Sequence, residues 1–169
     1  GITLGLAEQG ATIYITGRNL EELKKTTVLA NELGGTCIPI QCDHNNDAET
    51  AEVFAKIKNN ERKLSLLVNC AWGGYEDMVE NGNFTWVNKF WEQPIKRWDK
   101  IFAIGVKSIF VNSKNAMEFM LPSNEGLIVN ISFWAAQKYV GNVIYGASKV
   151  VADKLTADMA KELEKTEIS

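Results

Sequence analysis

Apolar residues along this chain recur at two spacings, and the two spacings alternate. Short runs rich in β-branched and aromatic residues predict strands at residues 11–16, 37–41, 64–69 and 126–131. Apolar positions three or four residues apart predict helices at residues 2–9, 20–33, 48–58, 95–120 and 145–164. Gly10 and Gly34 are typical of helix ends, and Asn19 is a predicted N-cap.

Strands that alternate with helices predict an α/β fold with a parallel sheet. The strands are nearly continuously apolar, as expected when helices cover both faces of the sheet. The chain has 169 residues, of which 46% are hydrophobic and 23% charged, and this composition predicts one domain over residues 1–169. Residues 70–94 form a long connection rich in Gly, Asn and Trp, which predicts a functional or mobile loop.

Charge and cysteine content exclude several functions. The net charge is −3 and no basic stripe is present, so nucleic acid is not an expected partner. Cys37, Cys42 and Cys70 are odd in number and unclustered, which argues against a disulfide framework or a zinc site. His44 is the only histidine, so we expect no metal site and no Ser-His-Asp triad.

The ends of the chain predict an internal piece of a longer protein. It begins without Met and already in a helical pattern, and it ends after a long helix, where another strand is expected. Targeting signals therefore cannot be read. We expect an intracellular protein, cytoplasmic or associated with the endoplasmic reticulum, because unpaired thiols suit a reducing compartment.

Tyr145 and Lys149 are the candidate reactive pair. Four residues separate them at the start of a predicted helix, so their side chains share one helix face. A nearby ammonium favours the phenolate and is expected to lower the pKa of the phenol. Alone this spacing more often marks solvated surface. Ser132, thirteen residues upstream at the end of a strand, changes the interpretation to a reduction site.

The order of these residues resembles the short-chain dehydrogenase/reductase family. Gly17 and Arg18, Asp43, and then Asn69 each follow a predicted strand in turn, before Ser132, Tyr145 and Lys149. The segments 13–18, 90–92 and 145–146 resemble one member of the family most closely. The resemblance implies a Rossmann-like, doubly wound parallel sheet in three αβα layers. The first strand with its Gly-rich loop would lie before residue 1, and the last strands after residue 169. We therefore expect the 169-residue chain alone to fold poorly and to bind cofactor weakly.

The resemblance also implies a mechanism and a cofactor. Tyr145 would exchange a proton with the substrate oxygen, Ser132 would hydrogen-bond that oxygen, and Lys149 would lower the pKa of Tyr145 and bind the nicotinamide ribose. Hydride would pass between NADP(H) and a carbonyl or alcohol.

Three further residues are implied cofactor ligands. Arg18 stands where an acidic residue would bind an NAD ribose, which favours NADP(H). Asp43 would contact adenine and Asn69 would lie near the cofactor. Their alternatives are a solvated Arg, a turn or capping Asp, and a strand-end Asn.

Departures from the family pattern leave an alternative open. Gly105 stands where the family often has a proton-relay Asn, Trp72 enlarges the loop after Asn69, and Phe133 follows Ser132 where a second Ser is common. The alternative is a weakly active or inactive nucleotide-binding or scaffold homologue. Helix 145–164 carries two apolar stripes, so one can cover the sheet and the other can face a partner subunit. The resemblance further implies a homodimer through residues 95–121 and 145–164. An aromatic group is expected to pack the long connection onto the domain, or else to close over a substrate; its members are Phe84, Trp86, Phe90, Trp91 and Trp98.

Overall fold

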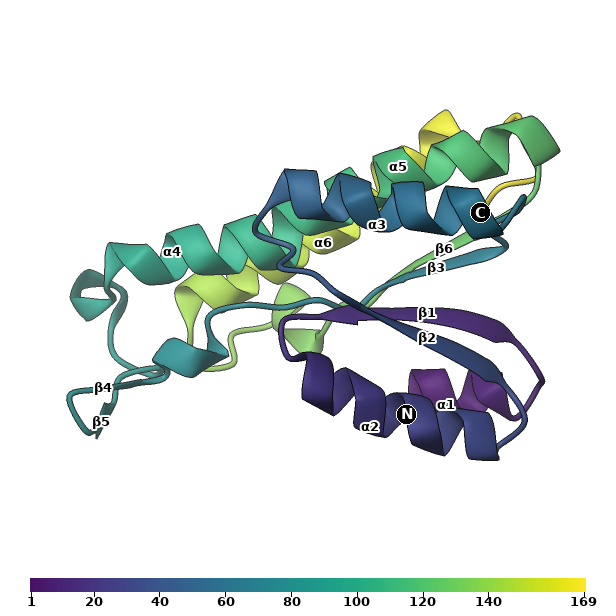
Figure 1. Cartoon of the computed structure of the whole chain (residues 1–169). Coiled ribbons are helices and arrows are strands. Elements are labelled where there is room, and N and C mark those ends of the chain that lie inside the picture. Colours follow the sequence, from purple (N-terminus) through teal and green to yellow (C-terminus); the bar gives the residue numbers. More distant parts are fainter. The chain divides into compact units, whose positions relative to one another are not determined.

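The computed structural model describes residues 1–169, which separate into two compact units, residues 1–60 and 61–169. Each unit is described by itself (Figure 1). The predicted alternation of strands and helices is confirmed within both units. The prediction of a single domain stays a prediction.

Unit 1 contains a parallel strand pair and three helices: α1 (Ile2–Ala7), β1 (Thr12–Gly17), α2 (Leu20–Glu32), β2 (Thr36–Gln41) and α3 (Asp47–Asn60). The two strands pair in parallel from Thr12 opposite Thr36 to Gly17 opposite Gln41. Asn19 caps α2, since its Oδ1 accepts hydrogen bonds from the backbone N–H groups of Glu21 and Glu22. The predicted cap is therefore confirmed.

Gly35 allows α1 to approach the start of β2 closely. A Cβ atom at this position would lie 2.7 Å from both Cα and Cβ of Ala7, which is fully buried in α1. Ala7, Ala30 and Cys37 form the buried core here, and Leu4, Ile13 and Ile15 pack against them. Gly35, which follows the end of α2, thus also sets how closely α1 packs against the start of β2.

Unit 2 carries a second parallel strand pair and the long helices. Its elements are β3 (Leu66–Asn69), the 3-10 turn η1 (Tyr75–Asp77), β4 (Val79–Glu80), β5 (Asn83–Phe84), the 3-10 turn η2 (Phe90–Glu92), α4 (Ile95–Phe102), the π-helical turn η3 (Ala103–Lys107), α5 (Ser108–Ser123), β6 (Leu127–Asn130), the 3-10 turn η4 (Trp134–Ala136) and α6 (Val143–Glu162). β3 and β6 pair in parallel, with Asn69 opposite Asn130. Both carboxyl ends therefore lie at one edge of this strand pair.

Three local features of unit 2 differ from the predictions. The long connection contains the antiparallel hairpin β4–β5, which turns through Asn81 and Gly82 at positive φ. The expected helix 95–120 is interrupted by the π-helical turn and continues to Ser123, followed by Asn124 in the left-handed conformation. Helix α6 begins at Val143, two residues before the predicted start. No helix is both long enough and apolar enough to span a bilayer.

Candidate active site

Asn142 fixes the start of α6 and thereby the position of Tyr145. Its Oδ1 accepts a hydrogen bond from the Tyr145 backbone N–H at 2.9 Å, and its Nδ2 donates to the backbone oxygen of Trp86 at 2.7 Å. Asn142 is 1% exposed. One side chain therefore caps the helix and attaches it to the 70–94 connection.

Aromatic rings surround the buried Tyr145 side chain. The Tyr145 ring centroid lies 5.4 Å from that of Trp72, 5.6 Å from Trp86 and 5.9 Å from Phe133. The hydroxyl of Tyr75 donates a hydrogen bond to the Tyr145 hydroxyl at 3.4 Å. The phenol thus lies in a mostly apolar environment with one polar neighbour.

This environment raises the pKa of Tyr145 well above its usual value. Burial is the main cause, because it disfavours the phenolate, and the contact with Tyr75 adds to it. The expectation that Lys149 lowers this pKa is therefore wrong for the structure described here. The Lys149 ammonium lies 5.8 Å from the Tyr145 ring centroid and is not among the groups that shift this pKa. Tyr145 is accordingly protonated at neutral pH.

Lys149 is buried without a carboxylate ion pair. Its Nζ donates to the backbone oxygen of Ile131 at 3.1 Å and lies 3.5 Å from the Trp72 ring centroid. Burial lowers the pKa of Lys149 to about 8, against smaller opposite effects of Cys70 and Asp153. The ammonium has two further N–H donors that a ligand can use.

Ser132 lies between the residues that contact Lys149 and Tyr145. The preceding residue, Ile131, accepts the Lys149 hydrogen bond, and the following residue, Phe133, packs its ring near Tyr145. The Ser132 Oγ is buried and has no hydrogen-bond partner. A buried hydroxyl without a partner is costly, so this atom is suited to bind a ligand oxygen. The two residues that flank Ser132 thus contact Lys149 and Tyr145, and the catalytic role of the three predicted residues stays a prediction.

Asn69 joins the carboxyl ends of β3 and β6. Its Nδ2 donates to Asn130 Oδ1 at 2.8 Å and to Ser113 Oγ at 3.3 Å, and its Oδ1 accepts from Asn112 Nδ2 at 3.0 Å. This network accounts for a buried Asn at the end of a strand. A contact with a cofactor stays a prediction.

Arg18 and Asp43 belong to unit 1, where they follow the paired carboxyl ends of β1 and β2. Arg18 is exposed, and its backbone oxygen accepts a hydrogen bond from Gln41 Nε2. Asp43 forms a turn, because its Oδ1 accepts from the Asn45 backbone N–H at 2.9 Å. The turn interpretation of Asp43 is confirmed, whereas both cofactor roles stay predictions.

His44 is part of the packing around the same turn. Its Nε2 lies 2.8 Å from Thr16 Oγ1, and burial lowers its pKa. No group of three or more His, Cys, Asp or Glu side chains is arranged to hold a metal ion.

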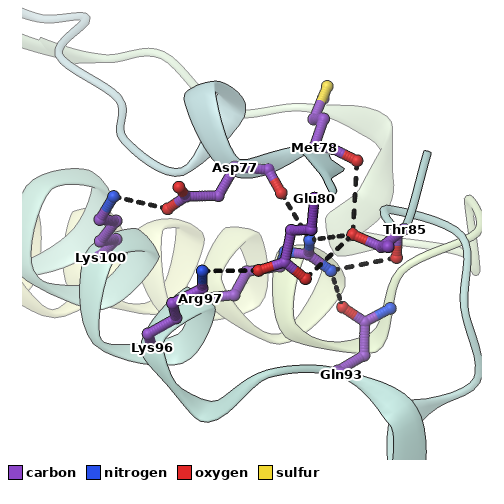
Figure 2. A network of polar contacts seen from close by, with 8 residues as sticks. All are labelled: Asp77, Met78, Glu80, Thr85, Gln93, Lys96, Arg97 and Lys100. Carbon is purple, nitrogen blue, oxygen red and sulfur yellow. Dashed lines mark hydrogen bonds and ion pairs between the residues drawn. The ribbon is translucent and has the colours of Figure 1, made fainter. Parts of the chain in front are cut away.

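Arg97 of α4 fastens the 70–94 connection from within (Figure 2). Its guanidinium is fully buried and donates to Asp77 O at 2.7 Å, Thr85 Oγ1 at 2.8 Å and Thr85 O at 3.1 Å, as well as to Gln93 Oε1. It also lies 5.6 Å from the Trp86 ring centroid. Arg97 therefore holds the segment that places Trp86 against Tyr145.

Two lysines on α4 reinforce this attachment. Lys100 pairs with Asp77 and Lys96 pairs with Glu80, both at 2.6 Å (Figure 2). The Lys100 ammonium lowers the pKa of Asp77, and that of Lys96 lowers the pKa of Glu80. Since these ion pairs are partly exposed, each adds little stability compared with the buried guanidinium.

The aromatic group of the connection divides in two. Trp86 is buried and packs onto the domain as expected, but the other four rings are exposed: Phe84, Phe90, Trp91 and Trp98. Trp98 stacks on Phe102, with the two ring centroids 4.2 Å apart. The packing prediction is thus confirmed for Trp86, and the alternative that the exposed rings close over a substrate stays a prediction.

Sequence reasoning missed Asn142, Tyr75 and Arg97 as parts of the site. An Asn directly before a helical pattern is a capping signal that was available. No local pattern marks Tyr75 or Arg97, because their contacts join residues that are distant in the sequence.

Comparison with known proteins identifies the whole chain with one family profile. The profile described as "short chain dehydrogenase" matches residues 1–169. The human protein "Dehydrogenase/reductase SDR family member 1" is 37% identical over 170 residues, which cover 100% of this chain and 53% of that protein. The chain thus spans about half the length of this relative. The predicted resemblance to this member of the family is confirmed.

Solved structures share the fold of this chain. A metagenomic short-chain oxidoreductase in complex with NADP matches with a TM-score of 0.85 at 22% identity, over 99% of this chain and 72% of that one. A 7α-hydroxysteroid dehydrogenase complexed with NADH and 7-oxo glycochenodeoxycholic acid matches with a TM-score of 0.85 at 24% identity, over 99% of this chain and 61% of that one. The predicted Rossmann-like α/β fold is confirmed.

Proposed function

This chain belongs to the short-chain dehydrogenase family, and from that premise we propose that the protein transfers hydride between NADP(H) and a carbonyl or alcohol. The proposal depends chiefly on one observation, the Ser132 hydroxyl, which is buried without a partner and lies in the chain between the residues that contact Lys149 and Tyr145. Oriented donors at a developing oxyanion are a common source of transition-state stabilisation.

Each residue has a distinct task in this reaction. A bound nicotinamide cofactor supplies the hydride. In reduction Tyr145 gives its phenolic proton to the carbonyl oxygen. Ser132 hydrogen-bonds the same oxygen, and Lys149 would hold the nicotinamide ribose through its remaining N–H groups.

We also propose that the substrate is an apolar carbonyl compound. Tyr75 and Phe133 expose 47% and 54% of their surface beside Tyr145. Exposed aromatic side chains next to Tyr145 favour a substrate with apolar surface.

The proton-donor role is tested with Tyr145→Phe in the full-length protein, measured by NADPH oxidation against a panel of carbonyl compounds. We expect turnover to fall by roughly 10²–10⁴-fold. The exposed Tyr139 provides a matched control, because Tyr139→Phe is expected to leave turnover unchanged. Unchanged turnover in Tyr145→Phe contradicts the role. Absence of turnover in the wild type on every carbonyl favours the scaffold alternative.

The cofactor preference is tested with Arg18→Asp. The substitution is expected to weaken NADPH binding and to spare NADH, because a carboxylate repels the 2′-phosphate and can accept a hydrogen bond from a ribose hydroxyl. Arg62→Asp makes the same charge change at another exposed arginine. Equal losses for NADPH and NADH in Arg18→Asp would show that the assignment is wrong.

A further inference from the structure

Residues 72–74 lie directly against the helix that contains the π-helical turn. A Cβ atom at Gly73 would be 2.6 Å from Cδ1 of Ile104, and one at Gly74 would be 2.8 Å from Cγ1 of Ile101. Gly74 also has φ +93, a conformation that other residues rarely adopt. The two glycines therefore permit a close approach that brings Trp72 onto the helix.

The Trp72 ring fills the space of a side chain at position 105. A Cβ atom at Gly105 would lie 2.6 Å from Cζ3 and 2.7 Å from Cε3 of the indole. Gly105 is buried inside the π-helical turn. A glycine inside a helix costs about 1 kcal/mol relative to alanine, so its presence here needs a packing reason. The indole supplies that reason, and it leaves no room for the relay Asn that the family resemblance implies here.

The face of the same indole contacts the Lys149 ammonium. Nζ lies 3.5 Å from the ring centroid, within the range of a cation–π interaction, and Lys149 is 5% exposed. The other charged or titratable groups that act on it are Cys70 and Asp153, with Tyr145 one helical turn away. The π face and the Ile131 carbonyl therefore both contact the charged group directly.

We propose that Trp72 is the positioning residue for Lys149, binding the ammonium on its indole face beside Tyr145, and that Gly105 is the residue that makes room for it. This inference rests on the proposed function for its catalytic meaning. Lys149 is then held by the indole face of Trp72, and position 105 carries glycine in place of the family's relay Asn.

The test follows the charge state of Lys149 and does not depend on turnover. Lys149 is labelled with trace acetic anhydride across pH in the full-length protein, and its peptide is quantified by mass spectrometry. Trp72→Leu removes the π face, so the amine should lose its proton at lower pH and label about fivefold faster at pH 7. Trp72→Phe keeps a face and should stay near the wild type. Trp98→Leu makes the same change at a ring that stacks on Phe102, and it should have no effect on the Lys149 midpoint.

The labelling profile separates charge from access. Better access alone raises the rate at every pH, whereas loss of the cation–π contact moves the midpoint. A Trp72→Leu midpoint that is unchanged or higher overturns the proposal. Because labelling needs no substrate, this outcome is independent of whether the proposed reaction is found.

Gly105→Ala tests the other half of the proposal. The added methyl group displaces the indole, so the Lys149 midpoint should fall in the wild-type background. In the Trp72→Leu background the same substitution should have no further effect, because the obstructing ring is gone. Additive effects of the two substitutions would overturn the pairing of Trp72 with Gly105.

Discussion

Replacing Arg97 with methionine should release the 70–94 connection from α4. Methionine keeps much of the buried volume but removes every donor. Of the four acceptors that lose the guanidinium, the Thr85 hydroxyl keeps its own hydrogen bonds to Met78 O and Glu80. Three are left unsatisfied: the backbone oxygens of Asp77 and Thr85, and the Gln93 side chain. Taken at the low end, about 1 kcal/mol for each unsatisfied acceptor, the loss is about 3 kcal/mol.

The low end applies because the substitution also removes the cost of burying a charge. No carboxylate pairs with Arg97 directly, since Asp77 and Glu80 pair with the two neighbouring lysines. The guanidinium is therefore a buried charge compensated by neutral acceptors and by the Trp86 ring.

Amide hydrogen exchange across residues 75–94 is the appropriate assay in the full-length protein, since it reports local opening. A local loss of about 3 kcal/mol corresponds to roughly 100-fold faster exchange. Lys96→Met removes a partly exposed ion pair and should change exchange by less than about fivefold. If Arg97→Met and Lys96→Met accelerate exchange equally, the buried guanidinium does not hold this segment.

Three further predictions concern single positions. Asn142→Ala should destabilise the protein by about 1–2 kcal/mol in urea unfolding, because it removes both the α6 cap and the bond to Trp86; an unchanged midpoint would contradict this. The lowered Lys149 pKa means that the unfolded chain binds its proton more tightly, so stability should rise as pH increases from about 8 towards the ordinary lysine pKa. Lys149→Met should remove that rise, and a rise that persists would assign it to another group. Gly35→Ala should cost about 1–3 kcal/mol in thermal unfolding, because its methyl group meets the α1 backbone at Ala7; a neutral effect would show that α1 shifts freely.

Periodicity in the sequence predicts most of the helices and strands of this chain. It places the Asn19 cap and the glycine that ends α2, because those signals are local. The spacing of Ser132, Tyr145 and Lys149 likewise predicts that they gather at the carboxyl end of a strand.

The electrostatic environment of the site was not predictable in the same way. The spacing of Tyr145 and Lys149 suggested a lowered phenol pKa, yet the pKa is raised because distant rings bury the hydroxyl. Such contacts come from the 70–94 connection, which has no helical or strand period of its own. Hairpin β4–β5 was missed for the same reason, although Asn81 and Gly82 form a recognisable turn pair.

Because Trp72 contacts Gly105, the residues at these two positions, 33 residues apart, must vary together. Neither can be replaced alone without cost, since a side chain at 105 requires a smaller residue at 72. A library that randomises both codons together should recover functional pairs that two separate libraries exclude. Relatives with a larger residue at 105 should correspondingly carry a smaller one at 72.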